Sequence, residues 1–306
     1  MKLAFSMPHQ LRIPAMTQPW ELSVSGPDQI KLLQWAEKLG FEMCCVPEHH
    51  VMPRAHVPLS GDFLLNAYVG MAMYAGATQR MRVNSCIAIL PLQHPITTAK
   101  QLATLDWLSG GRVTVTWAVG WCEGEYDLLG VDFHQRGAMA EEYTRAIIEL
   151  WTSAEPEFEG RFVSFKDIAF EPKCVQQPHI PIWFGGDADA VLRRVARHAS
   201  GWWPTQTAPD RIPERIDFIK SQPDYNGGLD DVFLGFGSGR MTIDHQATGD
   251  ESARAGQGKQ QMLDRLGWFA DLGVSWSGIP IPALSSIEEY YDYTQWIAEE
   301  IIPAVA

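Results

Sequence analysis

An acid and two histidines follow a short apolar run near the amino terminus. The run Met43–Pro47 has the composition of a buried strand, and Glu48, His49 and His50 follow it directly. In a parallel α/β protein, catalytic groups gather at the carboxyl ends of the strands. Because side chains alternate along an extended chain, one imidazole should face the active site, where it can exchange a proton, while the other turns away. The alternative is that both histidines are structural and bind the backbone or Glu48.

A metal site would need histidines and acids at a spacing that places them on one face. The candidate ligands are Glu48, His50, His9, His56, His94 and His134. None of them forms the paired spacing that is typical of a metal site. We therefore expect no metal, and a metal-dependent hydrolase is the poorer alternative.

A pair of glycines, Gly185 and Gly186, follows the apolar run Ile180–Phe184 and precedes a helical pattern. Glycines at such a turn expose backbone N–H groups beside the positive end of a helix, which suits a phosphate group. A glycine pair also serves any tight turn, however, and Asp187 and Asp189 would cap the helix and repel an anion. From the residues alone both interpretations stay open.

Tryptophans are concentrated near the ends of the apolar runs. The chain contains 12, and those near the predicted strand ends are Trp117, Trp121, Trp183, Trp202, Trp203 and Trp276. Flat rings at the mouth of a barrel suit a planar cofactor, while other indoles belong to the core.

Eight apolar runs that alternate with helical patterns must position these residues. The expected strands are Lys2–Ser6, Met43–Pro47, Arg82–Leu90, Arg112–Trp117, Ile180–Phe184, Gly201–Pro204, Val232–Phe236 and Val274–Ile279. The alternation predicts an α/β fold, a (β/α)8 TIM barrel with insertions, as a single domain over residues 1–306. An open, doubly wound sheet is the alternative.

Two segments interrupt the repeat. Residues Glu157–Pro172 alternate apolar and polar around Gly160-Arg161, which predicts a hairpin before the fifth strand. Residues Ser238–Gly258 are polar and glycine-rich and follow the seventh strand, so they are a candidate lid over the active site.

The composition limits the partners. With 24 basic and 37 acidic residues the formal net charge is −13, which argues against nucleic acid and anionic membranes and favours a small-molecule substrate. Met1–Ser6 enter an apolar strand without a signal-peptide pattern, and no apolar run is long enough to span a bilayer, so we expect a cytoplasmic protein. The five cysteines, at positions 44, 45, 86, 122 and 174, lack CxxC spacing and are expected to be reduced thiols.

Several motifs together resemble the bacterial-luciferase-like flavin-dependent oxidoreductases, a family that includes FMN monooxygenases and deazaflavin-dependent enzymes. The resemblance covers nearly the whole chain. It rests on the following segments, in this order: Leu39-Gly40-Phe41, Glu48-His49-His50, Ala88-Ile89-Leu90-Pro91, His94-Pro95, Ala99-Lys100, Leu105–Arg112, Val119-Gly120-Trp121, Glu125-Tyr126, Leu129–Phe133, Arg136-Gly137 and Pro181–Gly186.

The resemblance implies a barrel whose mouth holds a flavin ring. His49 matches the family's functional histidine, and it is assigned to catalysis together with Glu48. The phosphate is expected near Gly185-Gly186, and a non-proline cis peptide is expected between Cys86 and Ile87. The implied cofactor-binding residues are Ser85, Cys86, Ile87, Val119, Gly120, Trp121, Gly185, Gly186 and Asp187.

Four residues depart from the family pattern. Asp187 and Asp189 occupy a turn where hydroxyl residues would be expected. Val119 stands where luciferase has a basic residue near the phosphate. Trp121 occupies the place of a catalytic acid in the deazaflavin-dependent sugar dehydrogenases, which argues against sugar phosphate oxidation.

The expected function is that of a luciferase-like monooxygenase that uses reduced FMN to oxidise a small organic substrate, as a homodimer and with a separate flavin reductase. Two alternatives are hydride transfer with the deazaflavin coenzyme F420 and a flavin-binding barrel without catalysis. The long anionic tail of F420 would favour a basic track, and this acidic chain offers only scattered candidates, Arg12, Arg54 and Arg161. The segment from Gly120 to Gly137 argues against FMN, because it is most similar to the subgroup labelled deazaflavin-dependent.

Overall fold

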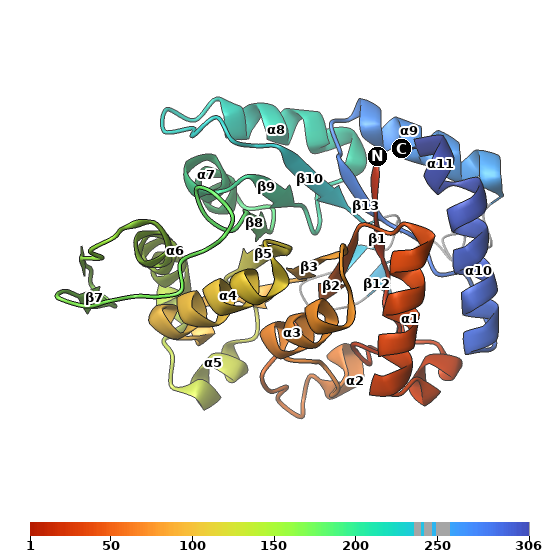
Figure 1. Ribbon diagram of the computed structural model, residues 1–306, viewed down its shortest axis with the longest axis horizontal. Coiled ribbons are helices and arrows are strands. Elements are labelled where there is room, and N and C mark those ends of the chain that lie inside the picture. Colours follow the sequence, from red (N-terminus) through yellow and green to blue (C-terminus); the bar gives the residue numbers. More distant parts are fainter. Residues whose placement is uncertain (236–239, 242–246, 249–257, 306) are drawn as a thin grey trace.

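Eight parallel strands close into a barrel in the computed structural model of the chain, which describes residues 1–235, 240–241, 247–248 and 258–305 (Figure 1). The strands are β1 (Lys2–Phe5), β2 (Met43–Val46), β3 (Arg82–Ser85), β5 (Val113–Ala118), β8 (Ile182–Gly185), β9 (Gly201–Trp203), β10 (Asp231–Leu234) and β13 (Trp276–Gly278). They are hydrogen-bonded in the order β3-β2-β1-β13-β10-β9-β8-β5, and β3 also pairs with β5. This closure confirms the predicted (β/α)8 barrel and excludes the open sheet.

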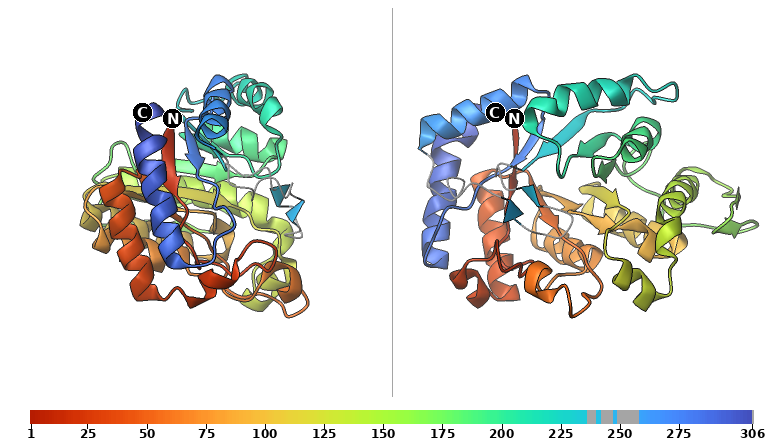
Figure 2. Two further views of the ribbon diagram at one scale, coloured as in Figure 1. Left: turned by 90° about the vertical axis from the view of Figure 1, so that its right-hand side faces the viewer. Right: turned by 180° about the vertical axis from the view of Figure 1, so that it is seen from behind.

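Helices run between the strands and cover the outside of the barrel (Figures 1 and 2). The longer ones are α1 (Gly26–Leu39), α3 (Ala67–Ala77), α4 (Pro95–Ser109), α6 (Arg136–Thr152), α7 (Asp189–His198), α8 (Ile212–Lys220), α9 (Lys259–Asp271) and α10 (Ile287–Glu300). The shorter ones are α2 (Val57–Ser60), α5 (Glu123–Leu129), α11 (Ile302–Val305) and the 3-10 turns η1 (Pro19–Ser23), η2 (Leu90–Leu92), η3 (Phe133–Gln135) and η4 (Pro209–Arg211). Among the described residues, no helix is long and apolar enough to cross a membrane.

The residues at the ends of α1 determine where β2 begins. The Ser25 hydroxyl accepts the N–H of Asp28, while the Asp28 carboxylate accepts the N–H of Ser25. This reciprocal pair is a capping box, and it satisfies two backbone donors at the start of the helix. At the other end Gly40 has a φ of +95°, a left-handed conformation that costs glycine little. The chain turns there and enters the strand that delivers the candidate catalytic residues.

The middle of the barrel is filled by large side chains. Met43, Trp183, Phe233 and Trp276 pack together there. A β-carbon at Gly201 would come within 2.2 Å of the Trp183 ring, so only glycine leaves room for this indole. The middle of the barrel is therefore a packed core, and any binding site must lie nearer the strand ends.

The predicted third strand, Arg82–Leu90, is divided in the structure. β3 ends at Ser85, and a two-residue strand, β4 (Ala88–Ile89), follows and pairs with β5. The peptide bond between Cys86 and Ile87 is cis, which confirms the expectation from the family resemblance. The third strand is shorter than predicted because the extended conformation is interrupted at this bond.

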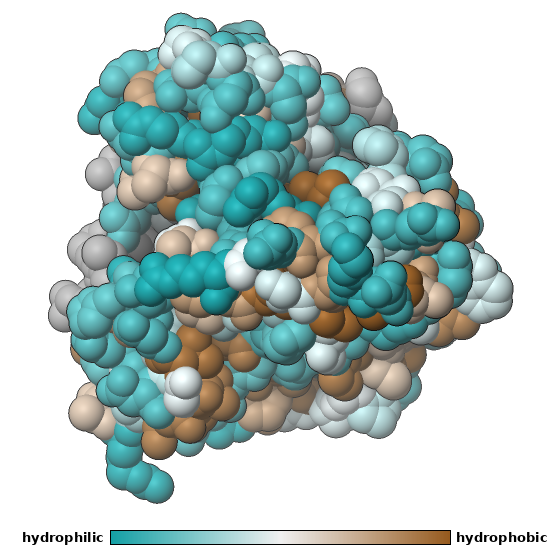
Figure 3. Space-filling model, turned by 90° about the vertical axis from the view of Figure 1, so that its left-hand side faces the viewer, coloured by the Kyte–Doolittle hydropathy of each residue, from teal (hydrophilic) through white to brown (hydrophobic). Residues whose placement is uncertain are grey.

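The first predicted insertion is confirmed as a hairpin. β6 (Phe158–Glu159) and β7 (Ser164–Phe165) pair antiparallel and project from the barrel beside α6 (Figure 1). Hydrophobic and hydrophilic residues are interspersed on the face that carries this hairpin (Figure 3).

The second insertion, the candidate lid Ser238–Gly258, lies mostly outside the described residues. Two short strands within it, β11 (Arg240–Met241) and β12 (Ala247–Thr248), pair antiparallel. The lid therefore stays a prediction.

Candidate active site

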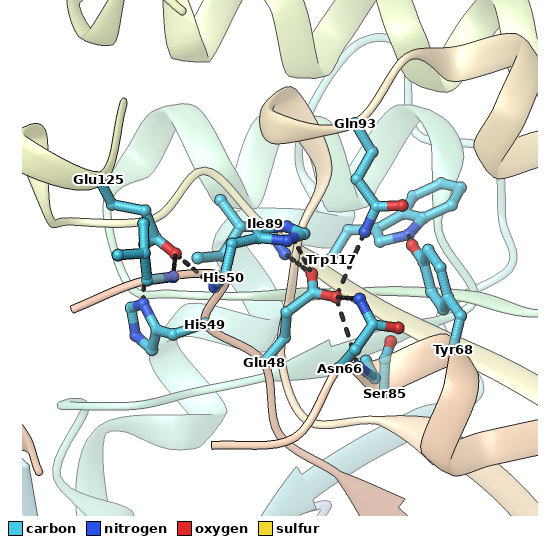
Figure 4. Close-up of polar contacts among 12 residues, drawn as sticks. Glu48, His49, His50, Asn66, Tyr68, Ser85, Ile89, Gln93, Trp117 and Glu125 are labelled. Carbon is cyan, nitrogen blue, oxygen red and sulfur yellow. Dashed lines mark hydrogen bonds and ion pairs between the residues drawn. The ribbon is translucent and has the colours of Figure 1, made fainter. Parts of the chain in front are cut away.

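His49 and Glu125 form a buried pair where β2 and β5 end. The Nδ1 atom of His49 lies 2.7 Å from Oε2 of Glu125, which is the third residue of α5 (Figure 4). The His49 and Glu125 side chains are only 8% and 1% exposed. The other oxygen of Glu125 accepts the backbone N–H of His50 at 2.6 Å and that of Val51 at 3.3 Å. One carboxylate therefore holds both the imidazole and the backbone that carries it.

The electrostatics of this pair determine which ring nitrogen can exchange a proton. Burial acts to raise the pKa of Glu125, but the hydrogen bond and the charge of His49, together with the N–H groups of His50 and Val51, lower it below its usual value of 4.5. An ionised carboxylate only accepts hydrogen bonds, so Nδ1 of His49 carries the proton in this contact. Proton exchange with a bound molecule then falls to Nε2.

Trp121 lies beside the same imidazole. Its ring makes edge contacts with His49, at a centroid distance of 5.8 Å, and with His56, at 5.5 Å. Gly120, just before it, has a φ of +68°, and a β-carbon there would come within 2.8 Å of Ile89. The structure thus brings the predicted residues Gly120 and Trp121 to the predicted catalytic histidine.

Glu48 points away from His49 (Figure 4). Its carboxylate accepts the N–H of Ile89 at 3.0 Å and the Gln93 amide at 3.2 Å. It also lies 3.4 Å from the Asn66 amide and 3.8 Å from Nε2 of His50. Burial raises the pKa of Glu48, and the charge of His50 opposes this only in part. Glu48 thus ties the end of β2 to the segment that follows the cis bond.

Small, partly exposed side chains form the floor of the barrel mouth. Five small residues lie at or next to the ends of the strands, on the inner face of the barrel, and are partly exposed. They are Ser6, Cys45, Cys86, Ala118 and Gly278. A β-carbon at Gly278 would make ordinary contact with Phe233 and Ser6, at 3.8 Å, so packing alone does not require glycine there. A floor of small residues beside a stacked Trp203–Phe233 pair, whose centroids are 3.6 Å apart, is compatible with a planar ring.

The remaining predicted cofactor residues have different surroundings. The Ser85 hydroxyl is buried and donates to the Thr116 carbonyl at 2.8 Å. The carbonyl of Val119 accepts the Tyr126 hydroxyl at 2.5 Å. Ile87 is partly exposed and packs on Gly185, where a β-carbon would come within 2.4 Å of its side chain. Of this group, Ser85 is buried, while Ile87 and Val119 are partly exposed.

The predicted phosphate turn has its own internal partners. The Gly186 N–H donates to the Trp203 carbonyl at 3.0 Å, and the Asp187 carboxylate binds the segment that follows β9. Among the described residues, no group of three or more histidines, cysteines or acids is placed to hold a metal ion.

Glu125 was not among the predicted site residues. Its position in the run Glu123-Gly124-Glu125 was visible, but two acids at a helix start are also typical of favourable contact with the helix dipole. The pairing with His49 appears only when α5 and β2 are placed together.

The variant Glu125→Gln is expected to lose stability in a pH-dependent way. Because the pKa of Glu125 is depressed in the folded protein, its ionised form contributes stability above its usual value of 4.5, and this contribution is lost as the pH falls through the folded pKa. We expect the variant to be less stable than the native chain by roughly 1–3 kcal/mol at pH 7. The difference should shrink below about pH 4. Urea unfolding at several pH values measures it.

The matched control is Glu123→Gln. The Glu123 side chain is 57% exposed and lies 3.6 Å from His134, so its loss should change the free energy of unfolding little. Equal effects of the two substitutions, or a Glu125→Gln deficit that does not vary with pH, would contradict the assigned pairing.

Comparison with known proteins identifies relatives of this chain. The model of the luciferase-like monooxygenase family matches residues 1–228. An uncharacterised protein of Mycobacterium tuberculosis (strain ATCC 25618 / H37Rv) is 38% identical over 199 residues, which are 60% of this chain and 70% of that protein. The FMNH2-dependent dimethylsulfone monooxygenase of Pseudomonas putida is 34% identical over 201 residues, which are 64% of this chain and 53% of that enzyme.

Solved structures share the fold at low sequence identity. The monooxygenase RslO1 from Streptomyces bottropensis superposes with a TM-score of 0.77 at 19% identity, over 100% of both chains. An F420-dependent secondary alcohol dehydrogenase superposes with a TM-score of 0.72 at 17% identity, also over 100% of both chains. Since the family model matches most of the sequence and the barrel agrees with it, this chain belongs to the luciferase-like monooxygenase family.

Proposed function

We propose that this chain is a flavin-dependent oxidoreductase, and specifically a monooxygenase that uses reduced FMN to oxidise a small organic molecule. The observation that carries the proposal is the buried His49–Glu125 pair beside a floor of small residues at the barrel mouth. The relative that is an FMNH2-dependent monooxygenase supports the choice of FMN. A flavin-binding barrel without catalysis would not need an imidazole held by a buried carboxylate.

The flavin ring would lie on the floor of the mouth, held by Cys86, Ile87 and Ala118 below and by Trp121 at the side. When bound, the reduced flavin supplies the electrons with which oxygen is activated. His49 moves a proton at Nε2, while Glu125 keeps its Nδ1 protonated and its ring fixed. Trp121 helps to exclude water from this end of the barrel.

Glu48 acts as a positioning residue in this proposal. It binds the N–H of Ile89, which lies two residues beyond the cis bond. In this way it holds the Cys86–Ile87 segment beneath the place proposed for the ring.

The partners and location of the enzyme follow from the same proposal. Reduced FMN must be delivered by a separate flavin reductase. The five cysteines are all free thiols, which suits the reducing cytoplasm. We propose one domain for residues 1–306.

Titration with each cofactor tests the choice of FMN. We expect the purified protein to quench FMN fluorescence at micromolar concentration and to bind F420 more weakly, because the net charge of the chain is −13 and Arg12 already pairs with Asp62 at 3.9 Å. Binding of F420 without measurable binding of FMN would overturn the monooxygenase proposal in favour of hydride transfer.

The variant His49→Ala should lower turnover of reduced FMN by roughly a hundredfold or more, because proton transfer is lost. His50→Ala is the matched control. The His50 ring lies 3.8 Å from Glu48 and on the other side of the segment, so its loss should be milder. Steady-state rates of both variants decide the matter, and equal or reversed losses would refute the role of His49.

A homodimer formed through α3 is also proposed. The helix contains no charged residue, and its outward residues Val69, Ala72, Met73 and Gly76 follow helical spacing. Val69 is 65% and Met73 59% exposed. An apolar stripe of this kind, with small residues that allow close approach, suits packing against the same helix of a second copy.

The double variant Val69→Glu with Met73→Glu should therefore be a monomer, because four acidic side chains would meet across the twofold axis. Light scattering measures the mass. Leu128→Glu, on an equally exposed residue of α5, is the control and should leave the dimer intact. A monomeric native chain, or a double variant that remains dimeric, would disprove this interface.

A further inference from the structure

The turn after β8 and the segment after β9 are joined by one carboxylate. Asp187 accepts the backbone N–H groups of Thr205 at 3.2 Å, Gln206 at 2.9 Å and Thr207 at 2.8 Å. It also accepts the hydroxyl groups of Thr205 and Thr207, each at 2.5 Å. Three consecutive backbone amides and two hydroxyls therefore surround a single side chain.

Such an arrangement is an anion site. Successive N–H groups that converge on one point form a concave positive surface, which binds phosphate or carboxylate oxygens equally well. In this protein the chain itself supplies the anion. The site lies on the rim of the barrel mouth, since Asp187 lies two residues beyond β8 and Thr205 lies two residues beyond β9.

Two other donors at this rim are also bound by groups of the chain. The Gly186 N–H donates to the Trp203 carbonyl. Arg215, from α8, donates to the Asp187 carbonyl at 3.0 Å and to the Asp189 carboxylate at 2.6 Å. The hydrogen bond from Arg215 lowers the pKa of Asp189, so Asp189 is ionised at the start of α7 and its charge is balanced by this guanidinium.

We infer that Asp187 is the internal occupant of this anion site and thereby a specificity-determining residue, which prevents a firm grip on the phosphate monoester of a flavin. The inference rests on the proposed function, since it assumes that the ring binds at the mouth. Recognition then depends on the ring, and the cofactor is released readily. That property suits a flavin that is exchanged with a reductase at each turnover.

Comparison of FMN with riboflavin isolates the phosphate, because the two flavins differ in that group alone. Fluorescence quenching of both oxidised flavins is measured for the native chain, Asp187→Ser and Asp187→Asn. For the native chain we expect dissociation constants within about threefold of each other. Asp187→Ser removes the carboxylate that occupies the N–H and hydroxyl donors. FMN should therefore bind about tenfold more tightly, while riboflavin binding changes little.

Two controls separate this effect from charge and from folding. Asp217→Ser, on the exposed side of α8, removes the same charge away from the rim and should leave both dissociation constants unchanged. Asp187→Asn keeps the shape and one accepting oxygen but loses the charge, so it should fold even if the serine variant does not. It should show a smaller gain for FMN.

Three results would count against the inference. A native chain that binds FMN at least tenfold more tightly than riboflavin would overturn it while leaving the proposed function intact. The same holds if neither Asp187 variant gains preference for FMN. Absence of binding for both flavins would overturn the proposed function, and the inference with it.

Discussion

The buried carboxylate of Glu125 holds in position the segment that follows β2. It belongs to α5, yet it binds the His49 ring and the N–H groups of His50 and Val51. A charge removed from water is costly unless hydrogen bonds compensate, so these three donors stay together while the carboxylate is ionised. The orientation of His49 is thus decided by a neighbouring part of the barrel and not by its own strand.

Glu48 performs a related task on the opposite side of the segment. The alternation of an extended chain turns Glu48 and His50 to one side and His49 to the other. Glu48 connects β2 to Ile89 and Gln93, and Glu125 connects it to α5. Two buried acids therefore fix one short segment from both sides, which pre-organises the imidazole before any ligand binds.

The rim of the barrel contrasts with its floor. On the floor, Cys45, Ala118 and Gly278 are small and partly exposed, while at the rim the Asp187 carboxylate accepts the backbone N–H groups of the segment after β9. Under the proposed function, a site with this division would recognise the ring of a flavin and leave its phosphate without a binding site. The glycines at the end of β8 serve packing in part, because Gly185 makes space for Ile87.

The sequence by itself determined the barrel, the hairpin before the fifth strand and the presence of an imidazole at the end of β2. Buried parallel strands leave continuous apolar runs, and these are visible in one dimension. The partner of His49 was not visible, because Glu125 lies 76 residues away and Glu123 offers the same carboxylate. For the turn at Asp187, two interpretations of the sequence stayed open: a phosphate-binding turn and a helix cap. Only the tertiary structure decided between them, because the hydrogen-bond donors to Asp187 come from Thr205–Thr207. The sequence pattern shows which residues are buried, but packing decides which polar groups meet.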